Sequence, residues 1–387
     1  MPIHIPENFF FGASSVKLKN WDKEDVGVIF SKTPAKAVGV FTTNKFLAAP
    51  VIVDKRNINN HIHFIIANSG IANACTGEKG IEDTYKIIKY VADKYKVSEK
   101  SILPSSTGII GKRLPVEKII KGIDNIKLGS SIESVKSFAR SIMTTDTFPK
   151  IASKRFSYRG KKYSILGFAK GAGMIYPNMA TMLSFILTDA NLKKDEMRKM
   201  LKRSVEKSFN SITVDGDMST NDTVILLSNG KNECVPSRIF YKYLKEIMIE
   251  LAKMIVKDGE GATKFITINI LNAPSKRLAK EIAMKVANSN LFKTAMFGED
   301  ANWGRIVSAI GSHKGKFYPE KIELFIGPYK LFQNMVPLNF DEKQVSKYLK
   351  NKEIEITIDM HQGKSKSTVW TCDLSYDYVK INADYRT

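Results

Sequence analysis

Short apolar runs of strand length alternate with helix-like repeats along this chain, and this alternation restricts it to folds that layer helices on sheets. The strand-like runs are rich in isoleucine, valine and leucine and are too short for helices that bury themselves on all sides. They are HIHFIIAN (61–68), LSFILT (183–188) and DTVILLS (222–228). Such runs predict strands that are covered on both faces.

The helix-like segments lie between and after these runs. Apolar residues recur at helical spacing over 81–97, and a second helix is expected to begin at a cap on Asn191 and to carry Leu192 to Val205. A longer helix is predicted over 237–257, ending at Asp258–Gly259. EIEITIDM (353–360) alternates strictly and predicts a half-exposed strand. We therefore expect a mixed α/β (α+β) protein of layered sheets and helices.

The chain length sets the expected number of lobes. With 387 residues and 43% apolar residues, the chain is long enough for a sizeable core and favours two domains or lobes. The sequence contains neither a long linker nor a repeat of fixed period.

The net charge of +21 permits two interpretations. A nucleic-acid-binding protein is one, and GIIGKR (108–113) has the GxxG form of a KH-type RNA loop. A solvated lysine-rich surface is the other, and it is favoured because basic residues occur in every segment. The densest basic cluster surrounds Arg159–Gly160, where we expect an exposed hairpin.

Cysteine and histidine usage argues against disulfides and metal sites. Cys75, Cys234 and Cys372 are far apart and form no CxxC pair, which suits a reducing cytosol. His61 and His63 share one strand face without a third ligand nearby in sequence, so no metal is expected. The N-terminus does not read as a signal peptide, and apolar runs are too short to span a bilayer. A cytoplasmic location is expected.

Several catalytic signatures are missing from the sequence. The chain has neither the GxSxG of a serine hydrolase nor the GxxxxGK[ST] of a P-loop. GAGMIY (171–176) begins like a dinucleotide-binding loop but lacks the third glycine. These observations leave nucleophilic catalysis by another residue type open.

The stretch KGAGMIYPNMATMLSFILTDA (170–190) places Thr181 between a glycine-rich loop and a strand. A threonine hydroxyl needs a nearby base to become a nucleophile. Cleavage of the Ala180–Thr181 bond would supply one, since the new α-amine has an unperturbed pKa of about 7.7–8.0. On these features alone, the alternative interpretation is that Thr181 has no catalytic role and only begins a strand after a loop.

Ordered blocks along almost the whole chain resemble the ornithine acetyltransferase family, the glutamate N-acetyltransferases of arginine biosynthesis. Besides 170–190, the blocks are PAKAVGVFTTNKFLAAPV (34–51), ANSGIANACTG (67–77), SSTGIIG (105–111), MTTDTFPK (143–150), FNSITVDGDMSTNDT (209–223), VKDGEGATK (256–264), NSNLFKTAMFGEDANWGRI (288–306) and CDLSYDYVKINADYRT (372–387). The resemblance implies an N-terminal-nucleophile-like site and self-cleavage into fragments 1–180 and 181–387. It also implies acetyl transfer from N-acetylornithine to glutamate through an acetyl-Thr181 intermediate.

The resemblance also assigns roles to individual residues. Thr107 and Gly108 match the oxyanion hole that would stabilise the tetrahedral intermediates. The matched substrate-binding residues, besides Thr181 itself, are Thr144 (with Thr145 as the neighbouring alternative), Lys170, Glu260, Asn382 and Thr387. A carboxylate at Glu260 suits an ammonium group of the substrate. Contacts from the chain end are unusual, because termini usually fray.

Some points stay open in the sequence. The family includes enzymes limited to acetylornithine and enzymes that also use acetyl-CoA, and no residue decides between them; no bound cofactor is expected. The two fragments are expected to stay together and to pair into an α2β2 heterotetramer, without a nucleic-acid or membrane partner. A related aminopeptidase or amidase with the same threonine is the alternative function, and a basic RNA-binding protein is the other.

Overall fold

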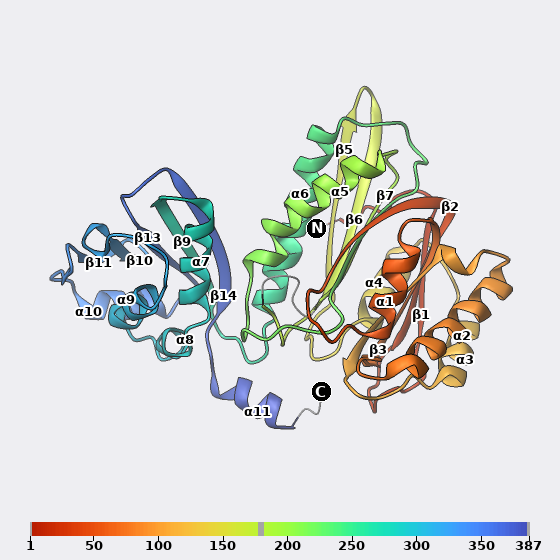
Figure 1. Cartoon of the computed structure of the whole chain (residues 1–387), viewed down its shortest axis with the longest axis horizontal. Helices are drawn as coiled ribbons and strands as arrows, with labels where there is room; N and C mark the ends of the chain where they lie inside the picture. The colour runs from red at the N-terminus through yellow and green to blue at the C-terminus, as the bar shows by residue number, and fades with distance from the viewer. Residues whose placement is uncertain (1, 177–181, 385–387) are drawn as a thin grey trace.

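The computed structural model describes residues 2–176 and 182–384 and has two lobes, each built on one sheet (Figure 1). Within the described residues, the larger lobe has an eight-stranded sheet in the order β4-β3-β2-β8-β7-β6-β5, with β1 paired to β2. The strands are β1 (Phe9–Ser14), β2 (Val26–Phe41), β3 (His61–Ile71), β4 (Ile102–Ile109), β5 (Lys150–Tyr158), β6 (Lys161–Lys170), β7 (Leu183–Thr188) and β8 (Thr223–Ser228). The predicted runs 61–68, 183–188 and 222–228 are thus strands of one sheet.

Strands β7 and β8 form a parallel pair inserted between two strands from earlier in the chain. β7 is antiparallel to β6, from Ile165↔Thr188 to Lys170↔Leu183, and β8 is antiparallel to β2. Strands on both sides of the predicted cleavage point therefore share one hydrogen-bonded sheet, and the predicted fragments do not coincide with the two lobes.

Helices cover both faces of the large sheet, as expected for buried strands. These helices are α1 (Ala49–Asn57), α2 (Gly77–Tyr95), α3 (Val116–Asn125), α4 (Ile132–Ser141), α5 (Lys194–Glu206) and α6 (Ser237–Lys257), with the short 3₁₀ turns η1 (Glu99–Ser101) and η2 (Phe209–Ser211). Alternate residues of β6 point to opposite faces, so Phe168 packs against Phe138 of α4. Gly167 lies directly under α6, where a side chain would meet Ile247 and Leu251. The sheet is therefore the middle layer of a three-layer lobe.

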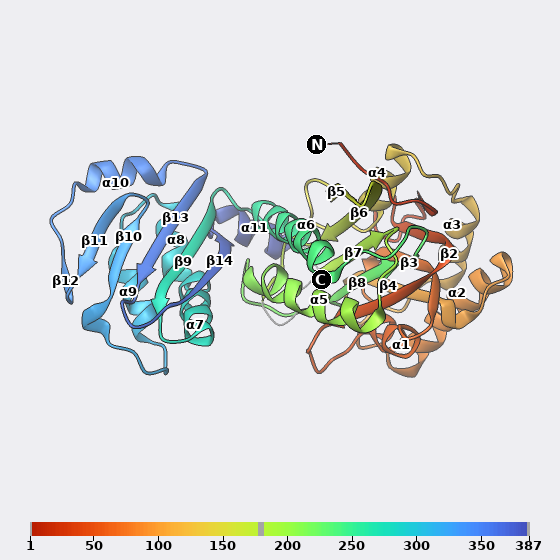
Figure 2. The ribbon, with the colours of Figure 1, turned by 90° about the horizontal axis from the view of Figure 1, so that it is seen from above.

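The smaller lobe is built on a sheet of strands from residues 265–372, and Figure 2 shows it separated from the larger one along the long axis. Its order among the described residues is β12-β11-β10-β13-β9-β14. The elements are β9 (Phe265–Ala273), α7 (Lys276–Ala287), α8 (Asn290–Phe297), α9 (Trp303–Gly311), η3 (Pro319–Lys321), β10 (Glu323–Ile326), β11 (Tyr329–Gln333), β12 (Val336–Pro337), α10 (Glu342–Leu349), β13 (Glu353–Asp359), β14 (Ser365–Cys372) and α11 (Tyr376–Asp384). As the alternation predicted, Ile354, Ile356 and Ile358 are buried in β13.

Local expectations are mostly confirmed, with one correction. The predicted 237–257 helix is α6, and a hairpin at Arg159–Gly160 joins β5 to β6. Asn191 does not cap a helix, because α5 begins three residues later. The Asn191 side chain instead accepts a hydrogen bond from Lys36 Nζ at 2.9 Å, and its backbone pairs with Cys234.

Candidate active site

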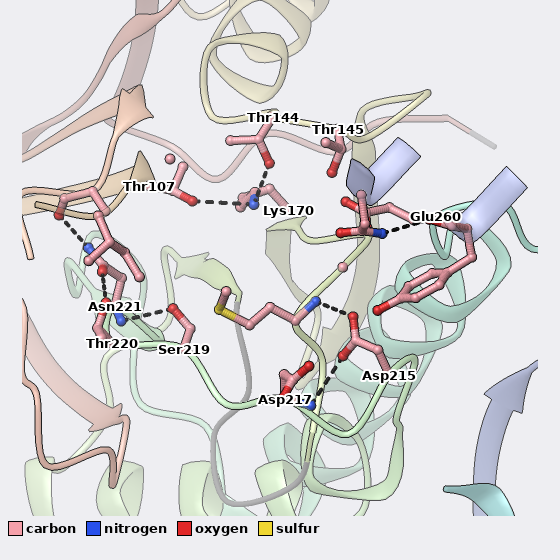
Figure 3. A pocket seen from close by; sticks show the side chains of 17 residues that line it. Thr107, Thr144, Thr145, Lys170, Asp215, Asp217, Ser219, Thr220, Asn221 and Glu260 are labelled. Carbon is pink, nitrogen blue, oxygen red and sulfur yellow. Dashed lines mark hydrogen bonds between the residues drawn. The ribbon is translucent and has the colours of Figure 1, made fainter. Parts of the chain in front are cut away.

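One cavity lies between the loops at the end of the large sheet and helix α11, and it collects most of the predicted site residues (Figure 3). The predicted residues that line it are Thr107, Gly108, Thr144, Lys170, Glu260 and Asn382, and Thr145 lines it too. The other predicted site residues, Ala180, Thr181 and Thr387, lie outside the described residues. Predicted site residues up to 275 positions apart in the sequence (107 to 382) therefore meet at one place.

Lys170 lies at the inner wall of this cavity, at the last residue of β6. Its ammonium donates hydrogen bonds to Thr144 Oγ1 at 2.9 Å and to Thr107 Oγ1 at 3.3 Å, as Figure 3 shows. Only 2% of Lys170 is exposed. Burial lowers the pKa of Lys170, and the charge of the nearby Asp146 carboxylate opposes this shift. The arrangement gives a cation and two hydroxyls on one side of the cavity.

Gly108 follows Thr107 at the end of β4, where the backbone passes very close to β3. Its φ of +129° belongs to a region that favours glycine, and a Cβ there would lie 2.2 Å from the carbonyl carbon of Gly70. Asn221 ties β4 to the residue that follows β3, because its Nδ2 donates to the Ser106 carbonyl at 2.8 Å and to the Ala72 carbonyl at 2.7 Å. The Thr107–Gly108 backbone is therefore fixed at the cavity wall.

Glu260 faces this wall from the opposite side of the cavity, just after α6. Its amide donates to the Ala172 carbonyl at 2.9 Å, which joins the α6 end to the chain after β6. Its carboxylate accepts a hydrogen bond from Asn382 Nδ2 at 2.8 Å, so the C-terminal helix α11 reaches the cavity. A side chain on Gly173 would occupy the same space as the Glu260 carboxylate.

Asp215 and Asp217 add further acidic groups that the sequence analysis did not assign to the site. Asp215 accepts hydrogen bonds from the backbone amides of Met174 and Ile175, at 2.5 and 2.8 Å. Burial raises the pKa of Asp215 to about 6 despite these bonds. The acidic DGD sequence within the 209–223 block was the one sequence signal that could have indicated these residues. Its contacts with residues 174–175 could not be predicted, because they form only in the folded chain.

The cavity is therefore electrostatically two-sided. Lys170 with its hydroxyl partners forms one side, and Glu260 with Asp215 forms the other, as Figure 3 shows. A small zwitterion such as an amino acid would find an attractive group for each of its charges. The Thr144 hydroxyl is the one bonded to Lys170, although Thr145 also borders the cavity.

The remaining candidate motifs have other structural settings. Gly108 of GIIGKR lines the cavity, and Arg113, the last residue of this motif, binds Asp83 through two hydrogen bonds of 2.7 Å. His63 is bonded through Nδ1 to the Ser31 carbonyl at 2.9 Å. Over residues 2–176 and 182–384, no group of three or more His, Cys, Asp or Glu side chains is arranged to hold a metal ion. In the same ranges, no helix has both the length and the apolar character needed to cross a membrane.

Comparisons with known proteins identify the family. A sequence profile of the ArgJ family matches residues 11–387. The arginine biosynthesis bifunctional protein ArgJ of Caldanaerobacter subterraneus subsp. tengcongensis is 46% identical over 397 residues, covering 100% of this chain and 98% of that protein. The protein of the same name from Thermotoga neapolitana is 45% identical, covering 99% of this chain and 100% of its own length.

A solved structure gives the same result. The crystal structure of the arginine biosynthesis bifunctional protein from Bacillus halodurans superposes with a TM-score of 0.50 at 39% identity, covering 52% of this chain and 98% of that one. Profile, relatives and structure agree, and they agree with the resemblance drawn from the ordered blocks. The chain belongs to the ArgJ family.

Proposed function

We propose that this chain is a glutamate N-acetyltransferase of arginine biosynthesis that moves the acetyl group of N-acetylornithine to glutamate. The convergence of Thr107, Gly108, Thr144, Lys170 and Glu260 on one cavity carries this proposal. Membership of the ArgJ family supports it, because the relatives carry the name of arginine biosynthesis bifunctional proteins.

The chemistry proceeds through an acetyl ester on Thr181. Self-cleavage between Ala180 and Thr181 frees an α-amine, which takes the proton of the Thr181 hydroxyl as Oγ attacks the acetyl carbonyl. The amide bond of acetylornithine breaks, ornithine leaves with the proton, and the amine of glutamate then attacks the ester to release acetylglutamate. Ping-pong kinetics follow from the shared acetyl-enzyme.

The described residues have defined roles in this scheme. Thr107 and Gly108 stabilise the oxyanion of both tetrahedral intermediates, each donor being worth about 3 kcal/mol. Lys170 and Thr144 bind the substrate carboxylate, and Glu260 with Asn382 binds its ammonium group. Thr387 contributes a last contact from the chain end.

Donor choice, assembly and location belong to the same proposal. The word "bifunctional" in the names of the relatives supports acetyl-CoA as a second acetyl donor. The enzyme works in the cytoplasm without a bound cofactor, metal or nucleic acid. Its two fragments, 1–180 and 181–387, remain together and pair as an α2β2 heterotetramer.

The test combines mass and activity measurements. Denaturing mass spectrometry of the purified protein should show fragments 1–180 and 181–387, and acetylglutamate should form from acetylornithine and, measured separately, from acetyl-CoA. Thr181→Ala should stay uncut and inactive. Full transfer by an uncut Thr181→Ala chain would refute the assignment of the nucleophile.

The same assay separates the alternatives. Hydrolysis of acyl donors without transfer to glutamate would identify an aminopeptidase or amidase. Binding to RNA that weakens steeply with salt, without acetyl transfer, would identify a nucleic-acid-binding protein.

A further inference from the structure

A cluster of buried charges lies directly behind the cavity wall, and its centre is a lysine that the proposed chemistry does not use. The Lys150 side chain has no exposed surface. Its ammonium lies 2.6 Å from Asp146 Oδ1 and 2.5 Å from Asp258 Oδ2. A lysine is rarely buried this completely, because removing its charge from water is costly unless it is paired.

Asp146 connects this lysine to the cation side of the cavity. Its Oδ1 also accepts a hydrogen bond from the Gly171 amide at 2.7 Å, and its Oδ2 accepts one from the Thr144 amide at 2.9 Å. The same Oδ2 lies 4.0 Å from Lys170 Nζ. Asp146 therefore fixes the backbone beside both Thr144 and Lys170.

Asp258 connects the lysine to the acidic side of the cavity. It follows the last residue of α6 and stands two positions before Glu260. Its carboxylate accepts hydrogen bonds from the Thr147 amide at 3.0 and 3.2 Å and from the Thr147 hydroxyl. The end of α6, which carries Glu260, is thus tied to the loop that carries Thr144.

The charges of the cluster balance, since Lys150 and Lys170 face Asp146 and Asp258. Burial raises the pKa of Asp146, but the charges of the two lysines outweigh burial and hold it well below its usual value. The charges that act most strongly on the pKa of Lys170 are those of Asp146, Lys150, Glu260 and Asp222. The charge of Lys23, which lies before β2, also interacts with that of Lys170.

We propose that Lys150 is a positioning residue, which joins Asp146 to Asp258 and so sets the spacing between the Lys170–Thr144 side and the Glu260 side of the cavity. This inference rests on the proposed function for its kinetic readout. Lys150 and Asp146 belong to the predicted fragment 1–180 and Asp258 to fragment 181–387, so the contact aligns the two fragments at the site.

The test uses a charge-balanced double variant, Lys150→Met with Asp258→Asn, because Lys150→Met alone would leave an unpaired buried carboxylate. The matched control is Lys257→Met with Glu353→Gln, which removes an exposed ion pair of 2.6 Å one residue before Asp258. Both proteins are checked for cleavage and folding, then assayed for acetyl transfer.

The proposal predicts a fall of at least about tenfold in kcat/KM for the double variant and no change for the control. It also predicts that the alkaline limb of the pH profile of kcat/KM moves to higher pH, because the charge of Lys150 lowers the pKa of Lys170 more strongly than the charge of Asp258 raises it. Lys150→Arg keeps the charge but alters the spacing, so it should lower kcat/KM without moving this limb. A folded double variant with unchanged kcat/KM and an unchanged limb would refute the proposal.

Hydrogen exchange provides a readout that does not depend on activity. Amides at 144–147, 170–172 and 258–260 should exchange faster in the double variant than in the wild type or the control. If the wild type transfers no acetyl group, the proposed function fails, and the exchange rates alone decide the positioning role. Unchanged exchange in all three segments would then refute it.

Discussion

Gly173 lies against the Glu260 carboxylate so closely that a Cβ at position 173 would be 2.3 Å from Glu260 Oε2. The displaced group is the end of a flexible side chain, so Gly173→Ala can be accommodated by moving Glu260. We expect the free energy of unfolding to change by no more than about 1 kcal/mol. We expect kcat/KM for acetyl transfer to fall by about tenfold or more, because the carboxylate leaves the position from which it is proposed to bind the substrate ammonium group.

Steady-state kinetics and denaturant unfolding of Gly173→Ala check this prediction. Gly304→Ala in α9 is the control, since its nearest neighbour would be at an ordinary 3.4 Å. Wild-type kinetics in Gly173→Ala would show that the position of Glu260 does not matter for catalysis.

Gly108→Ala should behave differently, because its Cβ would collide with backbone rather than with a side chain. The clash with Gly70 and the φ of +129° together should cost about 3 kcal/mol or more. Gly111→Ala also has a positive φ, of +80°, but meets nothing within 4 Å, so it should cost only about 1–2 kcal/mol. Denaturant midpoints of the two variants measure the difference, and equal midpoints would contradict the prediction.

Asp222 should affect self-cleavage. Its Oδ1 accepts a hydrogen bond from the amide of Met182 at 2.9 Å, and Met182 directly follows the predicted nucleophile in sequence. Losing this bond should cost about 1–3 kcal/mol, which corresponds to cleavage at least about fivefold slower in Asp222→Ala. Asp222→Asn keeps an acceptor oxygen and should still cleave.

Denaturing mass spectrometry over time after synthesis measures the uncut fraction of both Asp222 variants, with circular dichroism as the check on folding. Equal cleavage rates for the alanine and asparagine variants would show that this hydrogen bond does not assist cleavage.

Asp215 should make stability depend on pH. Its pKa is raised from 3.8 to about 6 in the folded protein, chiefly by burial, so the folded state keeps its proton longer than the unfolded chain. Stability should therefore fall as pH rises from about 4 to 6, by at most about 3 kcal/mol from this group. Asp215→Asn should remove that contribution.

Unfolding of the wild type and Asp215→Asn at several pH values from 4 to 7 isolates the effect, because the other titrating groups are common to both. As pH rises, the free energy of unfolding of Asp215→Asn should increase relative to that of the wild type. A difference that stays constant over this range would contradict the prediction.

Continuous apolar runs made the strands of the large sheet predictable, because a strand buried on both faces has a strong local signal. The runs at 61–68, 183–188 and 222–228 are such strands. Strand β10 has only four residues, which is too short for any periodicity to appear. The prediction of a helix cap at Asn191 was wrong, because the side chain of Asn191 binds Lys36, which is distant in the sequence.

The site was only partly predictable for a similar reason. The family motifs singled out Thr107, Lys170 and Glu260, which line one cavity in the structure, whereas the periodicity of apolar residues gave no information about them. Asp146 and Asp215 were missed because their partners are backbone amides and lysines that only the folded chain brings near them. Such residues have no local sequence pattern beyond being acidic.

The insertion of β7 and β8 between β2 and β6 has a consequence for a chain cut after residue 180. Neither piece holds a complete middle layer, so the pieces would melt as one unit rather than dissociate as intact bodies. Recovery from denaturant would then become a second-order reaction, with a rate that falls on dilution. An uncut chain would regain its structure at a rate independent of protein concentration.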